Sequence, residues 1–238
     1  MHRKTLLPIL MSAAALAVAT PRAAQAMEES PWFRYLEAEV DYADWGRNKR
    51  QMTWDAEGWI GGDTEKMSVK SEGEWSDGDL EEAEIQALYS RMIAPFWDVQ
   101  AGLRHDFRPD PTNYLVVALK GLAPYDFETD LSLFLSDEGD VSFRPKVSAD
   151  LLITQRLIAE PYVEAEFFAS DVPEQHVGAG LASIDTGLQI RYEVVREFAP
   201  YIDLNYTDKF GETGRIAEAE GESPDDFTVR IGLKFWIN

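Results

Sequence analysis

The feature that most constrains the fold of this chain is an alternation of apolar and polar side chains, repeated along most of its length. In YLEAEVDY (residues 35–42), every second position is acidic: Glu37, Glu39 and Asp41. The same period recurs in QMTWDAEGWI (51–60) and KMSVKSEGEW (66–75). A period of two sustained over such stretches predicts β-strands with one apolar and one polar face.

Segments of this kind recur about twelve times, which leaves roughly 18 residues for each strand with its connection. Strands of a soluble sandwich are usually about five or six residues long, whereas membrane barrels use strands of about 9–11 residues. The polar faces also carry too many charges to pack as an ordinary core. The chain is therefore predicted to be all-β, an antiparallel transmembrane β-barrel of about 12 strands and of the outer-membrane type. Its charged faces would line a lumen and its apolar faces would contact outer-membrane lipid.

The N-terminus has a different pattern. Residues 1–26 have a basic start, an apolar stretch from Leu6 to Ala19 and the small-x-small ending Ala24-Gln25-Ala26. This pattern predicts a secretory signal peptide, followed by a barrel domain over residues 27–238. The longest apolar run after it, Tyr114 to Leu119, is far shorter than the roughly 18 residues of a membrane helix.

Composition narrows the class of protein further. The chain has 43 acidic and 22 basic residues and a net charge of −21. The predicted signal peptide contributes basic residues only, so the mature chain is more acidic still. Such a chain repels phosphate backbones, which argues against nucleic acid as a partner. The absence of cysteine excludes disulfides, thiolate metal sites and thiol nucleophiles.

A motif of Ala, Pro and an aromatic residue recurs around Pro95, Pro124, Pro161 and Pro200. The spacing suits a repeat of hairpins, and it predicts that all four motifs form connections at one end of the barrel. Outer-membrane barrels have short periplasmic turns and longer external loops. We therefore expect the prolines and both termini at the periplasmic rim, and the long 211–225 segment outside.

Several long stretches also resemble one known family. WDAEGWIGGD, EEAEIQALYSRMIAPFWDVQAGLRHDFRPDP, GLAPYDFETDLSLFLSDEGD, LLITQRLIAEPYVEAEF and IRYEVVREFAPYI are similar to the copper resistance protein B family, over roughly Phe33 to Trp236. The resemblance implies an outer-membrane protein of Gram-negative bacteria that acts in copper resistance with periplasmic copper-handling proteins, and it implies copper ions as the ligand. Many members carry a Met- and His-rich segment before the barrel, which this chain lacks.

The candidate metal ligands follow from copper chemistry. Copper(I) favours thioether and thiolate ligands, and copper(II) favours imidazole and carboxylate. Met52, Met67 and Met92 are expected on outward, apolar faces, so carboxylates and the two histidines of the barrel domain remain. The predicted metal-interacting residues are Glu37, Glu39, Asp41, Glu72, Glu74, His105 and His176. The five acids would share one inner wall, with His105 pointing outward near the external rim and His176 in an external loop.

The charged lumen is compatible with two roles: ion pairs could fill a narrow barrel, or acidic side chains could form a path for cations. The predicted function is binding copper or passing it across the outer membrane; the alternative is a general porin or a structural barrel without specific copper binding. No enzyme is expected, since the chain has no Gly-x-Ser-x-Gly elbow. His105 and Asp106, moreover, would face opposite sides of a strand.

Overall fold

The computed structural model describes residues 32–44 and 50–237, so the predicted signal peptide lies outside the described part. The long strands are β1 (Phe33–Ala43), β2 (Gln51–Gly61), β3 (Glu65–Ser76), β4 (Asp79–Ala94), β5 (Trp97–Arg108), β6 (Thr112–Ala123), β7 (Phe127–Ser136), β8 (Val141–Ala149), β10 (Leu157–Phe168), β11 (Gly180–Tyr192), β12 (Phe198–Lys209) and β13 (Asp225–Ile237). The other elements are the two-residue β9 (Leu151–Leu152), the 3-10 helix η1 (Pro173–Gln175) and the helix α1 (Gly211–Glu220). Within the described ranges, no helix is long and apolar enough to cross a membrane.

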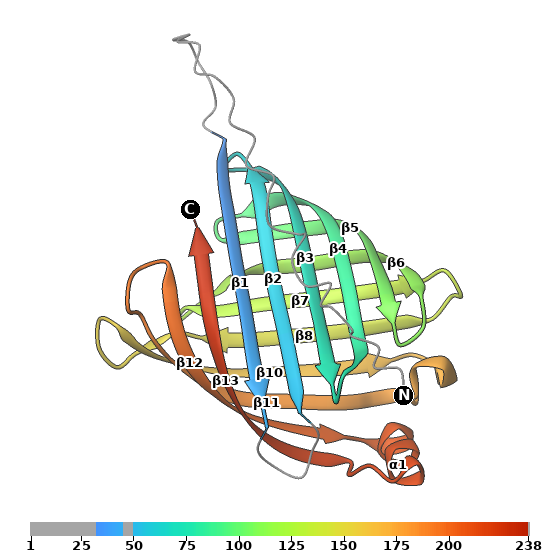
Figure 1. The fold of residues 1–238 in the computed structure, drawn as a ribbon. Helices are drawn as coiled ribbons and strands as arrows, with labels where there is room; N and C mark the ends of the chain where they lie inside the picture. Colours follow the sequence, from blue (N-terminus) through green and yellow to red (C-terminus); the bar gives the residue numbers. More distant parts are fainter. Residues whose placement is uncertain (1–31, 45–49, 238) are drawn as a thin grey trace, which may run out of the picture. The chain divides into compact units, whose positions relative to one another are not determined.

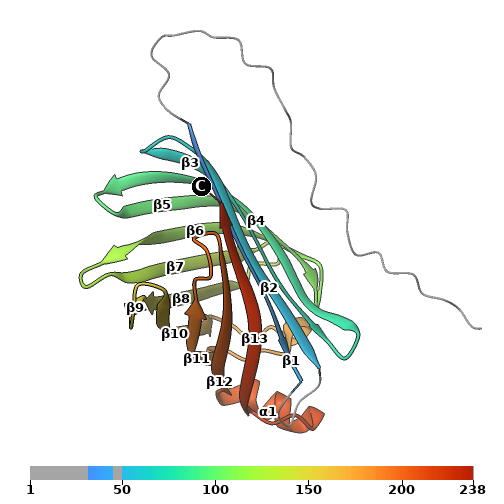
Figure 2. The same ribbon diagram turned by 60° about the vertical axis from the view of Figure 1, so that its left-hand side comes forward.

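The strands form one closed antiparallel sheet (Figures 1 and 2). Each long strand pairs with its neighbours in sequence, and β1 pairs with β13, from Leu36 opposite Ile237 to Tyr42 opposite Ile231. The pairing of β10 with β11 and of β10 with β8 continues the ring past the short β9. The predicted all-β class and the twelve-stranded barrel are confirmed.

The two ends of the barrel differ. The start of β1 and the end of β13 lie at one end, here called the termini end, and α1 lies at the opposite end, here called the helix end (Figure 1). At the helix end, the connection 169–179 contains η1 and the connection 210–224 contains α1. The two connections touch, because the backbone NH of Gly178 donates to Thr213 Oγ1 at 3.0 Å.

The side chains alternate between the outward and inward faces of the barrel, as predicted. The outward face carries exposed apolar residues, among them Leu36, Val69, Leu103, Leu115, Leu133, Val163, Ile202 and Ile231. The inward face carries buried polar residues, among them Lys70, Gln86, Gln100, Asp106, Gln189, Arg191, Asp203 and Lys234. A barrel with this inside-out pattern gains its stability from lipid on the outside and paired polar groups within.

The four proline motifs lie at the termini end, but only two of them form turns. Pro95 lies between β4 and β5, and Pro124 between β6 and β7, each followed by an aromatic residue with positive φ: Phe96 at 67° and Tyr125 at 71°. Pro161 and Pro200 lie inside β10 and β12 near their starts, so the prediction of connections there is wrong.

Gaps in the hydrogen-bond ladder explain why these strands tolerate proline. On the side of β8 and β9, Ala159 and Tyr162 of β10 have pairing partners, but Pro161 has none. Strand pairing is interrupted there, because Asp150 separates β8 from β9. On the side of β11, the partners of β12 begin only at Tyr201, one residue after Pro200. A missing backbone NH costs little where no ladder bond would form.

Candidate functional site: an acidic lumen

Acidic side chains line the inner wall of the first five strands. Residues directly opposite each other run across the sheet in one row: Glu39 of β1, Asp55 of β2, Glu72 of β3, Glu84 of β4 and Asp106 of β5. We call these five carboxylates the acidic row. Opposite residues on neighbouring strands have Cβ atoms about 4.5–5.5 Å apart, so like charges repel unless other groups compensate them.

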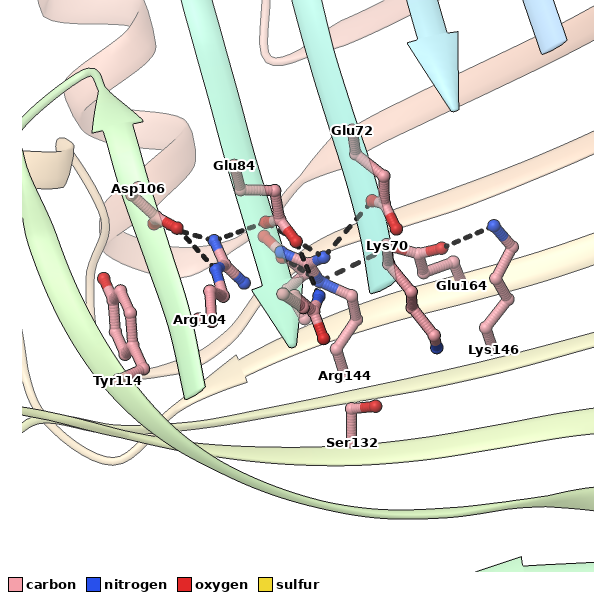
Figure 3. Close-up of polar contacts among 12 residues, drawn as sticks. Lys70, Glu72, Glu84, Arg104, Asp106, Tyr114, Ser132, Arg144, Lys146 and Glu164 are labelled. Carbon is pink, nitrogen blue, oxygen red and sulfur yellow. Dashed lines mark hydrogen bonds and ion pairs between the residues drawn. The ribbon is translucent and has the colours of Figure 1, made fainter. Parts of the chain in front are cut away.

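Two arginines compensate one end of the acidic row (Figure 3). Arg104 of β5 lies 2.7 Å from Glu84 Oε2 and 2.6 Å from Asp106 Oδ1. Arg144 of β8 reaches across the lumen, with Nη1 3.6 Å from both Glu72 and Glu84. Planar guanidinium groups suit such multiple carboxylate contacts.

Arg144 also links this cluster to the opposite wall. Its Nε lies 2.9 Å from Glu166 and 3.6 Å from Glu164, both on β10. Lys146, two residues further along β8, lies 3.5 Å from the second oxygen of Glu164 (Figure 3). One buried arginine thus joins carboxylates from three strands, β3, β4 and β10.

The remainder of the row is compensated unevenly. Lys234 of β13 lies 2.7 Å from Glu39 and 2.8 Å from Glu37. Asp55, the second member of the row, forms no ion pair with any described residue, although it lines the lumen. The other four carboxylates of the row each lie within 4 Å of a lysine or arginine nitrogen.

Further ion pairs cross the lumen towards the termini end. Lys70 pairs with Asp130 at 2.7 Å, Lys66 with Asp98 at 3.1 Å, and Lys120 with Glu57. Lys66 and Lys120 have the same parity as the inward Lys70 and Asp98 on their strands or neighbouring ones, so alternation accounts for their inward position. These pairs support the expectation of an ion-paired interior.

Apolar residues fill part of the lumen against the pattern. Leu88, Tyr114, Val116 and Phe134 pack together, each at most 6% exposed. The Arg104 guanidinium lies 5.0 Å from the Tyr114 ring centre, and both Arg104 and Arg144 lie over Phe134, at 4.8 and 5.3 Å. We call these six residues the packed region.

Three cavities lie in the rest of the lumen. A cavity of about 880 Å³ lies at the termini end, bordered by the rings of Tyr35, Trp59 and Trp236. It adjoins a cavity of about 340 Å³, which adjoins one of about 290 Å³ nearer the helix end; Glu160 lines all three. We call the last the acidic cavity, because its lining has ten carboxylates and only two cationic groups, Lys146 and Arg230.

The predicted acidic residues meet in this part of the lumen. Glu39, Asp41, Glu72 and Glu74 all line the acidic cavity, and Glu37 lines the two cavities nearer the termini end. Both oxygens of Asp41 accept hydrogen bonds, from Thr53 at 2.6 Å and Tyr201 at 2.9 Å.

The two histidines lie apart from the acidic wall. His105 points outward as predicted: its Nδ1 lies 2.9 Å from Asn113 Oδ1 and its ring packs edge-on against Phe107. His176 follows η1 at the helix end, and its Nδ1 lies 2.8 Å from Glu220 of α1. Among the described residues, no group of three His, Cys, Asp or Glu is arranged to hold a metal ion.

One methionine departs from its predicted place. Met67 is exposed on the outward face, as expected. Met92 follows Leu88 and Ser90 on the inward face of β4 and lines the 880 Å³ cavity, so the prediction of an outward Met92 is wrong. The sequence could have predicted the inward position of Met92, because Met92 alternates in step with Leu88 and Ser90, which are buried on the inward face.

Comparison with solved structures defines the class of protein. The KdgM porin aligns with a TM-score of 0.54 and 9% identity, covering 86% of this chain and 99% of the porin. The NanC porin aligns with a TM-score of 0.55 and 14% identity, covering 84% and 98%. At this identity the likeness concerns the fold alone, and it defines a barrel of the outer-membrane porin type.

Sequence comparison then gives the family. The model of "Copper resistance protein B precursor (CopB)" matches residues 34–237. Copper resistance protein B of Escherichia coli is 38% identical over 201 residues, covering 83% of this chain and 68% of that protein. A Copper resistance protein B homolog of Pseudomonas syringae pv. tomato is 33% identical over 237 residues, covering 98% and 80%. The chain belongs to the copper resistance protein B family, and the expected family is confirmed.

Proposed function

We propose that this barrel has a non-enzymatic role in copper resistance, in which copper ions bind transiently to its acidic lumen and pass along it across the outer membrane. The observation that carries the proposal is the acidic row, in which Asp55 forms no ion pair with any described residue, beside a cavity lined by ten carboxylates. Rings of acidic side chains favour cations in pores. A passing cation relieves the repulsion within the row, which gives the wall an affinity for cations without a rigid cage.

The ligand chemistry favours copper(II) at this wall, because carboxylate oxygens are among its preferred ligands. The acids proposed to attract it are Glu37, Glu39, Asp41, Glu72 and Glu74, with Asp55 added by the structure. Met92 is the described thioether that faces the lumen, in the cavity at the termini end. His105 and His176 contribute less, since neither lines the acidic cavity.

The test replaces carboxylates that have no cationic partner. Neutralising Glu37 or Glu39 would remove an ion-pair partner of Lys234, and neutralising Glu72 would remove one of Arg144. Either change could cause a folding defect that would obscure the effect on copper. Asp55 and Glu74 line the acidic cavity without an ion pair among the described residues. We expect D55N/E74Q to fold and to change copper tolerance and periplasmic copper content in a complemented deletion strain.

The matched control is H105A/H176A, which removes the imidazoles and leaves the wall intact. We expect it to change copper tolerance less than D55N/E74Q does. A folded D55N/E74Q barrel with the wild-type copper phenotype would show that the acidic wall is structural and would contradict the proposal.

We propose further that the protein lies in the outer membrane with its termini end towards the periplasm, where periplasmic copper-handling proteins would meet the 880 Å³ cavity. The chain has no cysteine of its own, so single cysteines report orientation cleanly. A cysteine replacing Glu218 in α1 should react with an impermeant thiol reagent on whole cells, and one replacing Tyr125, which is 91% exposed at the termini end, should not. The reverse pattern would invert the orientation.

The alternative is a general porin or a structural barrel. The cross-lumen pairs of Lys70 with Asp130 and of Lys120 with Glu57 favour a structural role, since they occupy the lumen. Liposome swelling separates the possibilities: uptake of uncharged sugars would indicate a general porin, and a barrel that passes neither sugars nor copper would be structural.

A further inference from the structure

The side of the acidic cavity formed by β11 and β12 contains two buried oxygen atoms that have no hydrogen-bond donor. Gln189 of β11 lies directly opposite Asp203 of β12, and both line the cavity. Gln189 is 8% exposed and Asp203 is 4% exposed. Neither Gln189 Oε1 nor Asp203 Oδ1 accepts a hydrogen bond from any residue in the described ranges.

The surroundings fix the orientation of both groups. Gln189 Nε2 donates to Glu39 Oε2 at 2.8 Å, so the amide cannot flip without setting two acceptors against each other. Asp203 Oδ2 accepts from the Tyr162 hydroxyl at 2.9 Å, which fixes the orientation of the carboxylate. The amide oxygen and the second carboxylate oxygen are therefore the atoms left for another partner.

The nearby cation does not serve as that partner. Arg230 lies 3.9 Å from Asp203 through Nη1 and the already bonded Oδ2, and its Nε has no hydrogen-bond partner among the described residues. Asp41, another acid that lines the cavity with Arg230, is already held by Thr53 and Tyr201. Buried acceptors without donors are uncommon in folded proteins and each needs an explanation.

We infer that Gln189 Oε1 and Asp203 Oδ1 form a subsite for a hard divalent cation, Mg²⁺ or Ca²⁺, on the β11–β12 side of the acidic cavity. Register pairing sets the two side chains face to face, about 4.5–5.5 Å apart at Cβ, so their oxygens can converge on one ion. Carboxylate and amide oxygens are ligands that these ions prefer. A cavity of about 290 Å³ has room for the ion's remaining water ligands. The inference stands whether or not copper passes through the lumen.

The test uses Tb³⁺, a hard oxygen-seeking probe whose luminescence is excited through a nearby tyrosine such as Tyr162. Purified barrel in detergent should sensitise Tb³⁺, and Ca²⁺ or Mg²⁺ should displace it. We expect D203N to weaken Tb³⁺ binding about tenfold or more, because it removes a ligand charge. Q189M should weaken it severalfold without any change of charge.

The matched control is D185N. Asp185 lines the same cavity, but it accepts a hydrogen bond from Thr207 and lies outside the subsite. It removes the same charge as D203N, and we expect less than about a twofold effect. A shift in gel migration between heated and unheated samples reports whether each barrel is folded. If D203N does not fold, the comparison of Tb³⁺ binding between Q189M and D185N tests the inference.

Three outcomes would overturn the inference. Tb³⁺ binding that Ca²⁺ and Mg²⁺ do not displace would show that these ions have no subsite. An effect of D185N equal to that of D203N would reduce the site to diffuse charge. Unchanged binding in Q189M would remove the amide oxygen from the site. Copper tolerance, measured on the same variants, tests the proposed function separately.

Discussion

The packed region and the acidic cavity are built from the same alternating strands, yet they solve the problem of buried charge in opposite ways. In the packed region, Arg104 and Arg144 pair with carboxylates and lie over aromatic rings, so charge is neutralised and space is filled. In the acidic cavity, ten carboxylates face two cations around open volume. The lumen thus has one filled part, in which charges are paired, and one open part, in which carboxylates outnumber cationic groups.

The largest effect should come from breaking the packed region at Arg144. R144M leaves four carboxylates, Glu72, Glu84, Glu164 and Glu166, without their shared partner. Removing one member of a buried ion network costs about 3–5 kcal/mol. Urea unfolding in detergent should show a loss of this size. R215A, which removes an exposed arginine of α1, should change stability by less than about 0.5 kcal/mol.

The apolar part of the packed region should respond almost as strongly. Leu88 is 1% exposed and contacts the Tyr114, Val116 and Phe134 cluster, so L88A opens a cavity there. We expect a loss of about 2–5 kcal/mol in the same unfolding assay. The matched comparison is D55N in the hollow part, which should be neutral or slightly stabilising, because it removes repulsion within the acidic row. A D55N loss as large as that of L88A would contradict the distinction between the two regions.

A smaller effect is expected where Gly232 and Tyr201 lie against each other on neighbouring strands. A Cβ added to Gly232 would lie 2.2 Å from the ring of Tyr201, whose hydroxyl donates to Asp41 of the acidic cavity. G232A should therefore displace the tyrosine, break this hydrogen bond and cost about 1–3 kcal/mol. A Cβ added to Gly62 would have no neighbouring atom within 4 Å, so G62A serves as the control. Equal stability of G232A and G62A would show that the ring moves freely.

The smallest effect is expected outside both regions. His176 and Glu220 join two connections at the helix end, with side chains 60% and 45% exposed. Exposed ion pairs contribute about 0.2–1 kcal/mol. H176A should fall within that range in the unfolding assay. A larger loss would mean that α1 stabilises the barrel through this contact.

Alternation was enough to predict the barrel and the acidic wall. Glu39, Asp55 and Glu72 lie on consecutive strands with short connections, so their meeting needs only parity and register. The contacts of Arg144 with Glu72 and Glu84 could not be predicted in this way, because they join strands that meet only across the closed lumen. Which acid an arginine reaches there depends on barrel diameter and strand stagger.

The other misses have local causes. Phe134 faces inward although apolar residues of a barrel are expected outside, because the guanidinium groups of Arg104 and Arg144 lie over its ring. Leu88 packs in the same apolar cluster. Pro161 was predicted in a connection, since proline usually disrupts a strand. It lies inside β10 instead, because the interruption of pairing at Asp150 leaves no ladder hydrogen bond that would need its backbone NH. Such gaps depend on the neighbouring strand and have no signature in the segment itself.

The acidic row has a consequence for the medium in which the protein works. Five neighbouring strands, about 5 Å apart, spread its carboxylates over roughly 20 Å. At 0.15 M salt the Debye length is about 8 Å, so an ion at either mouth senses only the nearest charges. At 0.01 M the length grows to about 30 Å, and the whole row acts on that ion together. The attraction of the acidic row for cations should therefore be strongest in dilute water and weaken steeply as salinity rises.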